Sequence, residues 1–129
     1  MQLVILWHNR GMRLLLHIID EAAWRTAVDL GSYRPDSVTD EGFIHCSTPA
    51  QVLGPANALY RGQTGLVLLC IDADRVAAPI VYEDCYDTGQ AFPHIYGALN
   101  LDAVVGVIRF PPNADGSFSL PALDGVARP

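Results

Sequence analysis

The sequence predicts a small α+β fold, with a split, mostly antiparallel sheet and two main helices. Short apolar runs typical of strands are dispersed among only two helical patterns, without the βαβαβ regularity of a doubly wound sheet. Half of the residues are hydrophobic, which is typical of a globular chain. The length of 129 residues suits one domain with its own core. We expect that domain to span residues 12–120.

The first elements alternate between strand and helix. Residues 13–19 are a short apolar run and are predicted to form a buried strand. Asp20 is a good N-cap for a helix over residues 21–30, whose apolar positions fall on one side. Gly31 ends this helix. Residues 32–41 contain several turn-forming residues and are predicted to be a loop.

The later elements follow from the same kinds of signal. Thr48 and Pro49 offer a hydroxyl N-cap followed by a proline at the first helical position, so a second helix begins there. We expect further strands at residues 42–46, 66–71, 80–83 and 104–110, an irregular segment at 92–100, and an edge strand at 117–120.

Both ends of the chain are predicted to lie outside the domain. Residues 1–11 are expected to be an N-terminal extension, and either Met1 or Met12 is the true start. Arg10 follows the apolar stretch at the N-terminus, whereas a signal peptide places its charge before that stretch. Residues 121–129 are expected to form a mobile tail.

Composition excludes several functions. The net charge is -6 and all eight basic residues are arginine, so neither a Schiff-base lysine nor a P-loop lysine exists. No basic cluster is available to follow a phosphate backbone, which argues against a nucleic-acid partner. The longest apolar run, residues 66–71, is too short to span a membrane. Three cysteines without a CxxC spacing favour reduced thiols in the cytoplasm.

Three histidines carry the strongest chemical signal. His17 and His45 each lie in a predicted strand and would face one pocket if those strands are neighbours, while His94 follows a proline. Imidazole donates and accepts hydrogen bonds, binds metals and titrates near neutral pH. Two alternatives remain: core histidines with satisfied hydrogen bonds, or a three-histidine zinc or iron site. Cys46 adjoins His45 but should point to the opposite face, which argues against a Cys–His pair.

Two other residue types could contribute to the same site. Glu83 closes a predicted strand, where a carboxylate can orient a sugar hydroxyl or stabilise an oxocarbenium ion. Such a glutamate is also often merely solvated or paired with arginine. Tyr82 and Tyr96 could stack on a flat ring or belong to the core.

Two sequence blocks resemble a known family. GFIHCST at residues 42–48 and FPHIYG at residues 92–97, together with the apolar run at 66–71, resemble the bacterial domain-of-unknown-function 952 family. The resemblance spans residues 13–110. The first block is expected to form a pocket wall and the second a loop that closes over the pocket.

The layout is also similar to the ADP-ribosyltransferase superfamily, particularly its tRNA 2′-phosphotransferase branch. That resemblance implies a split sheet around a cleft suited to a nicotinamide–ribose group. It implies that His17 hydrogen-bonds the ribose and His45 lines the pocket, while Tyr96 stacks on the ring and Glu83 supports the oxocarbenium. Leu16 stands where the phosphotransferases carry arginine, which argues against a tRNA substrate.

We therefore expect a cytoplasmic protein that binds a nucleotide-like small molecule in a histidine-lined cleft. NAD is the implied substrate, for ADP-ribosyl transfer or NAD cleavage, and no cofactor or metal is assigned. The expected catalytic residues are His17, His45 and Glu83, and the expected ligand-binding residues are Phe43, Ser47, His94 and Tyr96. The alternatives are a non-catalytic interaction module and a metal protein that uses His17, His45 and His94.

Overall fold

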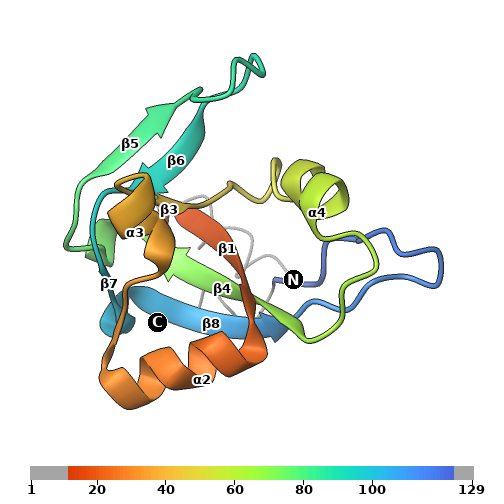
Figure 1. Ribbon diagram of the computed structural model, residues 1–129, viewed down its shortest axis with the longest axis horizontal. Helices are drawn as coiled ribbons and strands as arrows, with labels where there is room; N and C mark the ends of the chain where they lie inside the picture. Colours follow the sequence, from red (N-terminus) through yellow and green to blue (C-terminus); the bar gives the residue numbers. More distant parts are fainter. Residues whose placement is uncertain (1–11, 124–129) are drawn as a thin grey trace.

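The computed structural model describes residues 12–123, and its central element is a three-stranded antiparallel sheet. β4 lies between β1 and β8 in this sheet, and Figure 1 shows the three strands crossing the middle of the molecule. The strands are β1 (Leu14–Asp20), β4 (Leu66–Asp72) and β8 (Val104–Arg109). The predicted strands at 13–19, 66–71 and 104–110 are thus confirmed to within one residue at each end.

The central sheet is covered on both faces, which explains why β4 reads as an unbroken apolar run. Alternate residues of a strand point to opposite faces. Leu69 and Ile71 belong to one core cluster, with Ile44 and Ile95. Leu68 belongs to a second cluster on the other face, with Val52 and Phe110 among its other members. The strand therefore contributes to two cores at once.

A second sheet packs against the first cluster. Its order is β3-β6-β5, and both of its strand pairs are antiparallel. The strands are β3 (Ile44–His45), β6 (Phe92–Ile95) and β5 (Ile80–Glu83). Two backbone hydrogen bonds between Leu16 and Ser47, of 2.7 and 2.9 Å, connect this region to β1. In Figure 1 the β5–β6 hairpin extends away from the central sheet.

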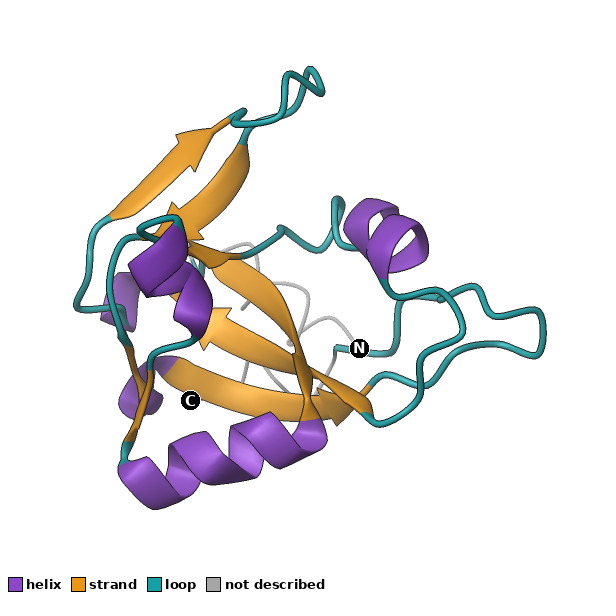
Figure 2. Cartoon of the chain, viewed as in Figure 1, coloured by secondary structure: helices purple, strands orange, loops and turns teal. Residues whose placement is uncertain are grey.

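Helices lie around the sheets rather than between them, as Figure 2 shows in purple. They are α2 (Glu21–Leu30), α3 (Asp36–Asp40) and α4 (Leu53–Leu59), with short 3-10 turns at Ala73–Arg75 and Leu101–Ala103. The cap predictions for α2 are confirmed. The Asp20 side chain accepts from the Ala22 N–H at 2.8 Å, and Gly31 adopts the left-handed conformation with φ 82°.

The prediction of a loop at residues 92–97 was wrong, because β6 is the middle strand of its sheet and β7 (Leu99–Asn100) pairs soon after it. Pro93 explains the error, since proline argues against a central strand. Its carbonyl accepts from the Cys46 N–H at 3.1 Å, so its nitrogen points toward β3 as well. Proline has no N–H to return a bond to the Cys46 carbonyl, and the β3–β6 ladder accordingly ends at the His45–His94 pair.

Three other expectations differ in detail. Residues 32–41 contain α3 and the short strand β2 (Ser32–Tyr33), which pairs with β7. The second helix begins at Leu53, because residues 48–52 form a turn first. Residues 117–120 are not a strand, although Phe118 is buried and stacks on Phe110 with ring centroids 4.7 Å apart.

The predicted extension at residues 1–11 lies outside the described residues, as does the part of the predicted tail from 124 onward. Leu123 packs against the second core cluster, as does Met12 at the other end. No helix within residues 12–123 is long and apolar enough to cross a membrane.

Candidate functional site

The β3-β6-β5 sheet has one apolar face and one face that carries titratable and aromatic side chains. Ile44 and Ile95 are fully buried against the first core cluster. Because side chains alternate along a strand, the residues between and beside them point the other way. We call that side, together with the residues bonded to it, the histidine face; it consists of Glu41, Phe43, His45, Glu83, Tyr86, His94 and Tyr96.

One chain of hydrogen bonds on this face runs from Tyr86 through Glu41 to His45. The His45 Nε2 lies 2.8 Å from Glu41 Oε1, and the Tyr86 hydroxyl donates to Glu41 Oε2 at 3.0 Å. The Tyr86 ring also stacks on the His45 ring, with centroids 6.1 Å apart and planes 18° apart. Gly42, with φ 98°, turns the chain between α3 and β3, which brings Glu41 back over His45.

A second chain of the same kind runs from Tyr96 through Glu83 to His94. The His94 Nδ1 lies 2.8 Å from Glu83 Oε2, and the Tyr96 hydroxyl donates to the same oxygen. Cys85 Sγ lies 3.8 Å from the His94 Nδ1. His94 is only 2% exposed, whereas the Glu83 side chain is 28% exposed. The second chain therefore has a buried imidazole and a carboxylate that solvent reaches.

Phe43 lies between these two chains of hydrogen bonds. Its ring stacks on the His94 ring at a centroid distance of 3.9 Å, with the planes 13° apart. It also contacts His45 edge-on at 4.8 Å and Tyr96 at 5.2 Å. Phe43 is buried, so it fixes the planes of the surrounding rings by packing.

Both carboxylates of the histidine face are held in the ionised state. Hydrogen bonds from His45 and then from Tyr86 lower the pKa of Glu41. Hydrogen bonds from Tyr96 and then from His94 lower the pKa of Glu83. The same Glu83 hydrogen bond raises the pKa of the Tyr96 hydroxyl to about 12. A carboxylate that only accepts fixes the proton on the facing imidazole nitrogen, so His45 donates from Nε2 and His94 donates from Nδ1.

His17 lies beneath this face rather than on it. Its Nδ1 donates to the His45 carbonyl oxygen at 2.6 Å, and its Nε2 accepts from the Tyr33 hydroxyl at 2.9 Å. Burial lowers the pKa of His17 to about 4 and raises the pKa of Tyr33. Both ring nitrogens therefore have partners within the protein, and the neutral imidazole joins β1, β2 and β3.

The structure thus brings His45 and His94 together but gives His17 other neighbours. The His45 and His94 rings are cross-strand partners with centroids 5.4 Å apart. Within residues 12–123 the ligating atoms of the three histidines do not gather within 4.8 Å of one another. Ser47 is buried and its backbone pairs with Leu16. Cys46 points into the first core cluster, where burial raises the pKa of its thiol to about 12.

Sequence reasoning missed Glu41, Tyr86, Tyr33 and Cys85 as neighbours of the histidines. Glu41 stands just before the Gly42 turn and four residues before His45, which was the available signal. Tyr86 and Cys85 lie in the loop between β5 and β6. That loop is folded by Asp84, which accepts from the Thr88 and Gly89 backbone N–H groups at 2.8 and 2.7 Å. No rule of sequence spacing connects Tyr86 and Cys85 with β3.

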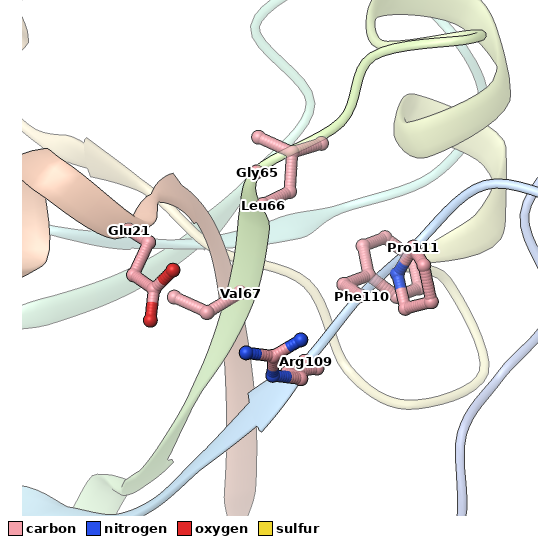
Figure 3. A pocket seen from close by; sticks show the side chains of 7 residues that line it. All are labelled: Glu21, Gly65, Leu66, Val67, Arg109, Phe110 and Pro111. Atoms are coloured by element: carbon pink, nitrogen blue, oxygen red, sulfur yellow. The ribbon is translucent and has the colours of Figure 1, made fainter.

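A small hollow lies elsewhere, beside the start of α2, the start of β4 and the end of β8 (Figure 3). Its volume of about 100 Å³ is well below the several hundred Å³ of an ordinary small-molecule pocket. It is lined by Glu21, Gly65, Leu66, Val67, Arg109, Phe110 and Pro111. None of these residues belongs to the histidine face.

Comparisons with known proteins found similar solved structures and one matching family. The crystal structure of protein CC0527 from Caulobacter crescentus matches with a TM-score of 0.75 and 30% sequence identity, over 83% of this chain and 94% of that one. The solution NMR structure of CC0527 matches with a TM-score of 0.72 and 31% identity, over 87% of this chain and 94% of that one. No curated protein matches. The family described as "Protein of unknown function (DUF952)" matches residues 18–107, so the chain belongs to the DUF952 family.

Proposed function

We propose that the protein binds a nucleotide-like small molecule on the histidine face and acts on it by proton transfer. The observation that carries this proposal is the pair of Tyr–Glu–His chains on one side of one sheet. Two imidazoles, each oriented by an ionised carboxylate, are the arrangement used by general acid–base catalysts. The carboxylate fixes the tautomer of the imidazole and stabilises the imidazolium that forms when it accepts a proton.

The free ring nitrogen of His45 defines its role. His45 donates from Nε2 to Glu41, which leaves Nδ1 as the nitrogen that accepts a proton. Its side chain is 41% exposed, so a ligand reaches it without rearrangement of the sheet. We assign His45 as the general base, Glu41 and Tyr86 as the residues that position it, and His17 as a support for the β3 backbone beneath it.

The charge of the face favours the nicotinamide end of the ligand over its phosphates. Two ionised carboxylates lie on the face, and the chain carries a net charge of -6. Phosphate would be repelled by them, whereas a cationic ring or a ribose hydroxyl would be attracted. Tyr86 is 60% exposed, and its aromatic side chain offers a flat surface for such a ring.

NAD is therefore the ligand class that we propose, with the nicotinamide–ribose group on the histidine face. Glu83 is the carboxylate that would stabilise an oxocarbenium ion at the ribose, as in ADP-ribosyl transfer or NAD cleavage. The likeness of sequence layout to the ADP-ribosyltransferase superfamily supports the same choice. The cytoplasm, where NAD is abundant and thiols stay reduced, is the compartment that fits three free cysteines.

Calorimetric titration with NAD, nicotinamide mononucleotide and AMP tests this proposal. We expect the two nicotinamide compounds to bind and AMP to bind at least about tenfold more weakly, a difference of about 1.4 kcal/mol. Glu41→Gln and His45→Gln should each weaken binding by about tenfold or more, the value of one hydrogen bond to a charged group. Arg25→Ala, an exposed change on α2, is the matched control and should bind normally.

No heat and no thermal shift with any nicotinamide compound at millimolar concentration would overturn the proposal. Binding without release of nicotinamide would support the recognition step alone and identify the protein as a non-catalytic binding module. Chelator is included in every titration, so that the result does not depend on metal ions.

A further inference from the structure

Three side chains with metal-ligating atoms converge at one end of the β5–β6 hairpin. Glu83 ends β5, Cys85 lies in the loop that follows, and His94 lies in β6. One carboxylate oxygen, the Cys85 Sγ and a ring nitrogen of His94 all lie within 4.8 Å of one another. We propose that these three residues bind a divalent transition-metal ion of the zinc type.

The separations are close to those that zinc imposes. Zn–S and Zn–N bonds of about 2.3 and 2.0 Å at a tetrahedral angle place sulfur and nitrogen about 3.5 Å apart. The Cys85 Sγ and His94 Nδ1 are 3.8 Å apart. The His94 Nδ1 and Glu83 Oε2 are 2.8 Å apart and would separate to about 3.4 Å around the ion, since the metal replaces a direct hydrogen bond. These two separations therefore need to change by well under 1 Å, and the Glu83 carboxylate oxygen and the Cys85 Sγ lie within 4.8 Å of each other.

Two residues that are not ligands themselves already hold two of the three ligands in place. Phe43 stacks on the His94 ring and fixes its plane. The Tyr96 hydroxyl donates to Glu83 and fixes that carboxylate. Metal sites depend on such outer contacts, which orient the ligands before the ion arrives. The Cys85 side chain is exposed and Glu83 partly so, which gives an ion a path from solvent.

The donor set selects the class of ion. One thiolate, one imidazole and one carboxylate suit Zn²⁺ or Co²⁺ and not Mg²⁺ or Ca²⁺, which take oxygen ligands. On binding, the Cys85 S–H bond breaks, its proton passes to solvent, and the thiolate forms the bond to the metal. His94 exchanges its Nδ1 proton for one on Nε2 through solvent and binds through Nδ1. Three protein ligands leave the fourth position for water.

The experiment uses the full chain, purified without a histidine tag, and titrates it with Co²⁺ and then with Zn²⁺ as competitor. We expect one ion per chain, and a near-ultraviolet charge-transfer band that reports a cobalt–thiolate bond. Cys85→Ser should abolish this band. Glu83→Gln should weaken binding by at least the ~10–100-fold that loss of an outer partner costs. Glu21→Gln, on α2, is the matched control and should leave affinity unchanged.

A variant outside the ligand set separates a built site from adventitious binding. Tyr96→Phe should weaken Co²⁺ binding by about 10–100-fold while the charge-transfer band is kept. Urea unfolding of each variant identifies any that fails to fold. Absence of Co²⁺ binding, or a band that survives Cys85→Ser, would overturn the proposal. Because no organic ligand is present, this result is independent of the test of nicotinamide binding.

Discussion

The imidazoles of His45 and His94 face each other across β3 and β6 with ring centroids 5.4 Å apart, and each is bonded to its own glutamate. The two pairs differ in exposure, since the His45 side chain is 41% exposed and His94 is 2% exposed. The His45 imidazole is therefore open to solvent, whereas the His94 imidazole is covered by its neighbours.

Removal of the His17 side chain should destabilise the fold without direct loss of a ligand contact. His17→Ala leaves the His45 carbonyl and the Tyr33 hydroxyl without their partners, and we expect a loss of about 3 kcal/mol in the free energy of unfolding. Tyr33→Phe breaks only one of the two hydrogen bonds and should cost about 1 kcal/mol. Urea unfolding measures both. Equal losses in the two variants would contradict this account.

Stability should depend on pH through His17. Its pKa is about 4 in the folded protein and about 6.5 when unfolded, so the unfolded chain binds the proton first as the pH falls. The stability that comes from burying His17 in its neutral form is fully present above a pH of about 6.5. It is lost as the pH falls toward about 4, and the total loss in the free energy of unfolding is up to about 3 kcal/mol. His17→Gln does not titrate, so its profile should be flatter over this window. Parallel profiles for the two proteins would refute the assignment.

Phe43 should contribute strongly to stability, although it lies within the candidate site. Phe43→Ala opens a cavity between His94, His45 and Tyr96, and we expect a loss of about 3–5 kcal/mol. Leu59→Ala is the matched control, because Leu59 is 75% exposed and its loss should change stability by less than about 0.5 kcal/mol. Thermal and urea unfolding test the pair. A Phe43→Ala protein as stable as the control would show that the stack carries no packing energy.

The two tyrosines should each control one carboxylate. The Tyr96 hydrogen bond is the largest cause of the lowered pKa of Glu83, so Tyr96→Phe should raise that pKa. Tyr86→Phe should raise the pKa of Glu41 and leave Glu83 unchanged. NMR titration of the glutamate carboxyl carbons distinguishes the two sites, and each variant is the control for the other. A change in the pKa of both glutamates in either variant would show that the two hydrogen-bond chains are coupled to each other.

Local signals in the sequence located much of the fold. The caps of α2, at Asp20 and Gly31, and the bounds of β5 at Ile80–Glu83 were all predicted, because each depends on neighbouring residues alone. The strand β6 was not predicted, because Pro93 is unfavourable in a central strand. Its strand conformation depends on pairing with β3 and β5.

The residues that make up the histidine face were anticipated in part. His45, His94, Glu83 and Tyr96 were candidates by residue type and Phe43 by family resemblance, and the structure places all five on one face. The pairing of Glu41 with His45, and of Tyr86 with Glu41, requires the Gly42 turn and the loop after β5 to be folded. His17 was expected to face the same pocket as His45, but its ring contacts the His45 backbone instead.

NMR of the histidine side chains tests most directly whether a nicotinamide-type ligand binds on the histidine face. We predict that nicotinamide mononucleotide shifts the imidazole signals of His45 strongly and those of His17 little, and that Glu41→Gln diminishes the His45 shift. Unchanged imidazole signals, with shifts confined to residues such as Glu21 and Arg109 around the separate hollow, would contradict the claim.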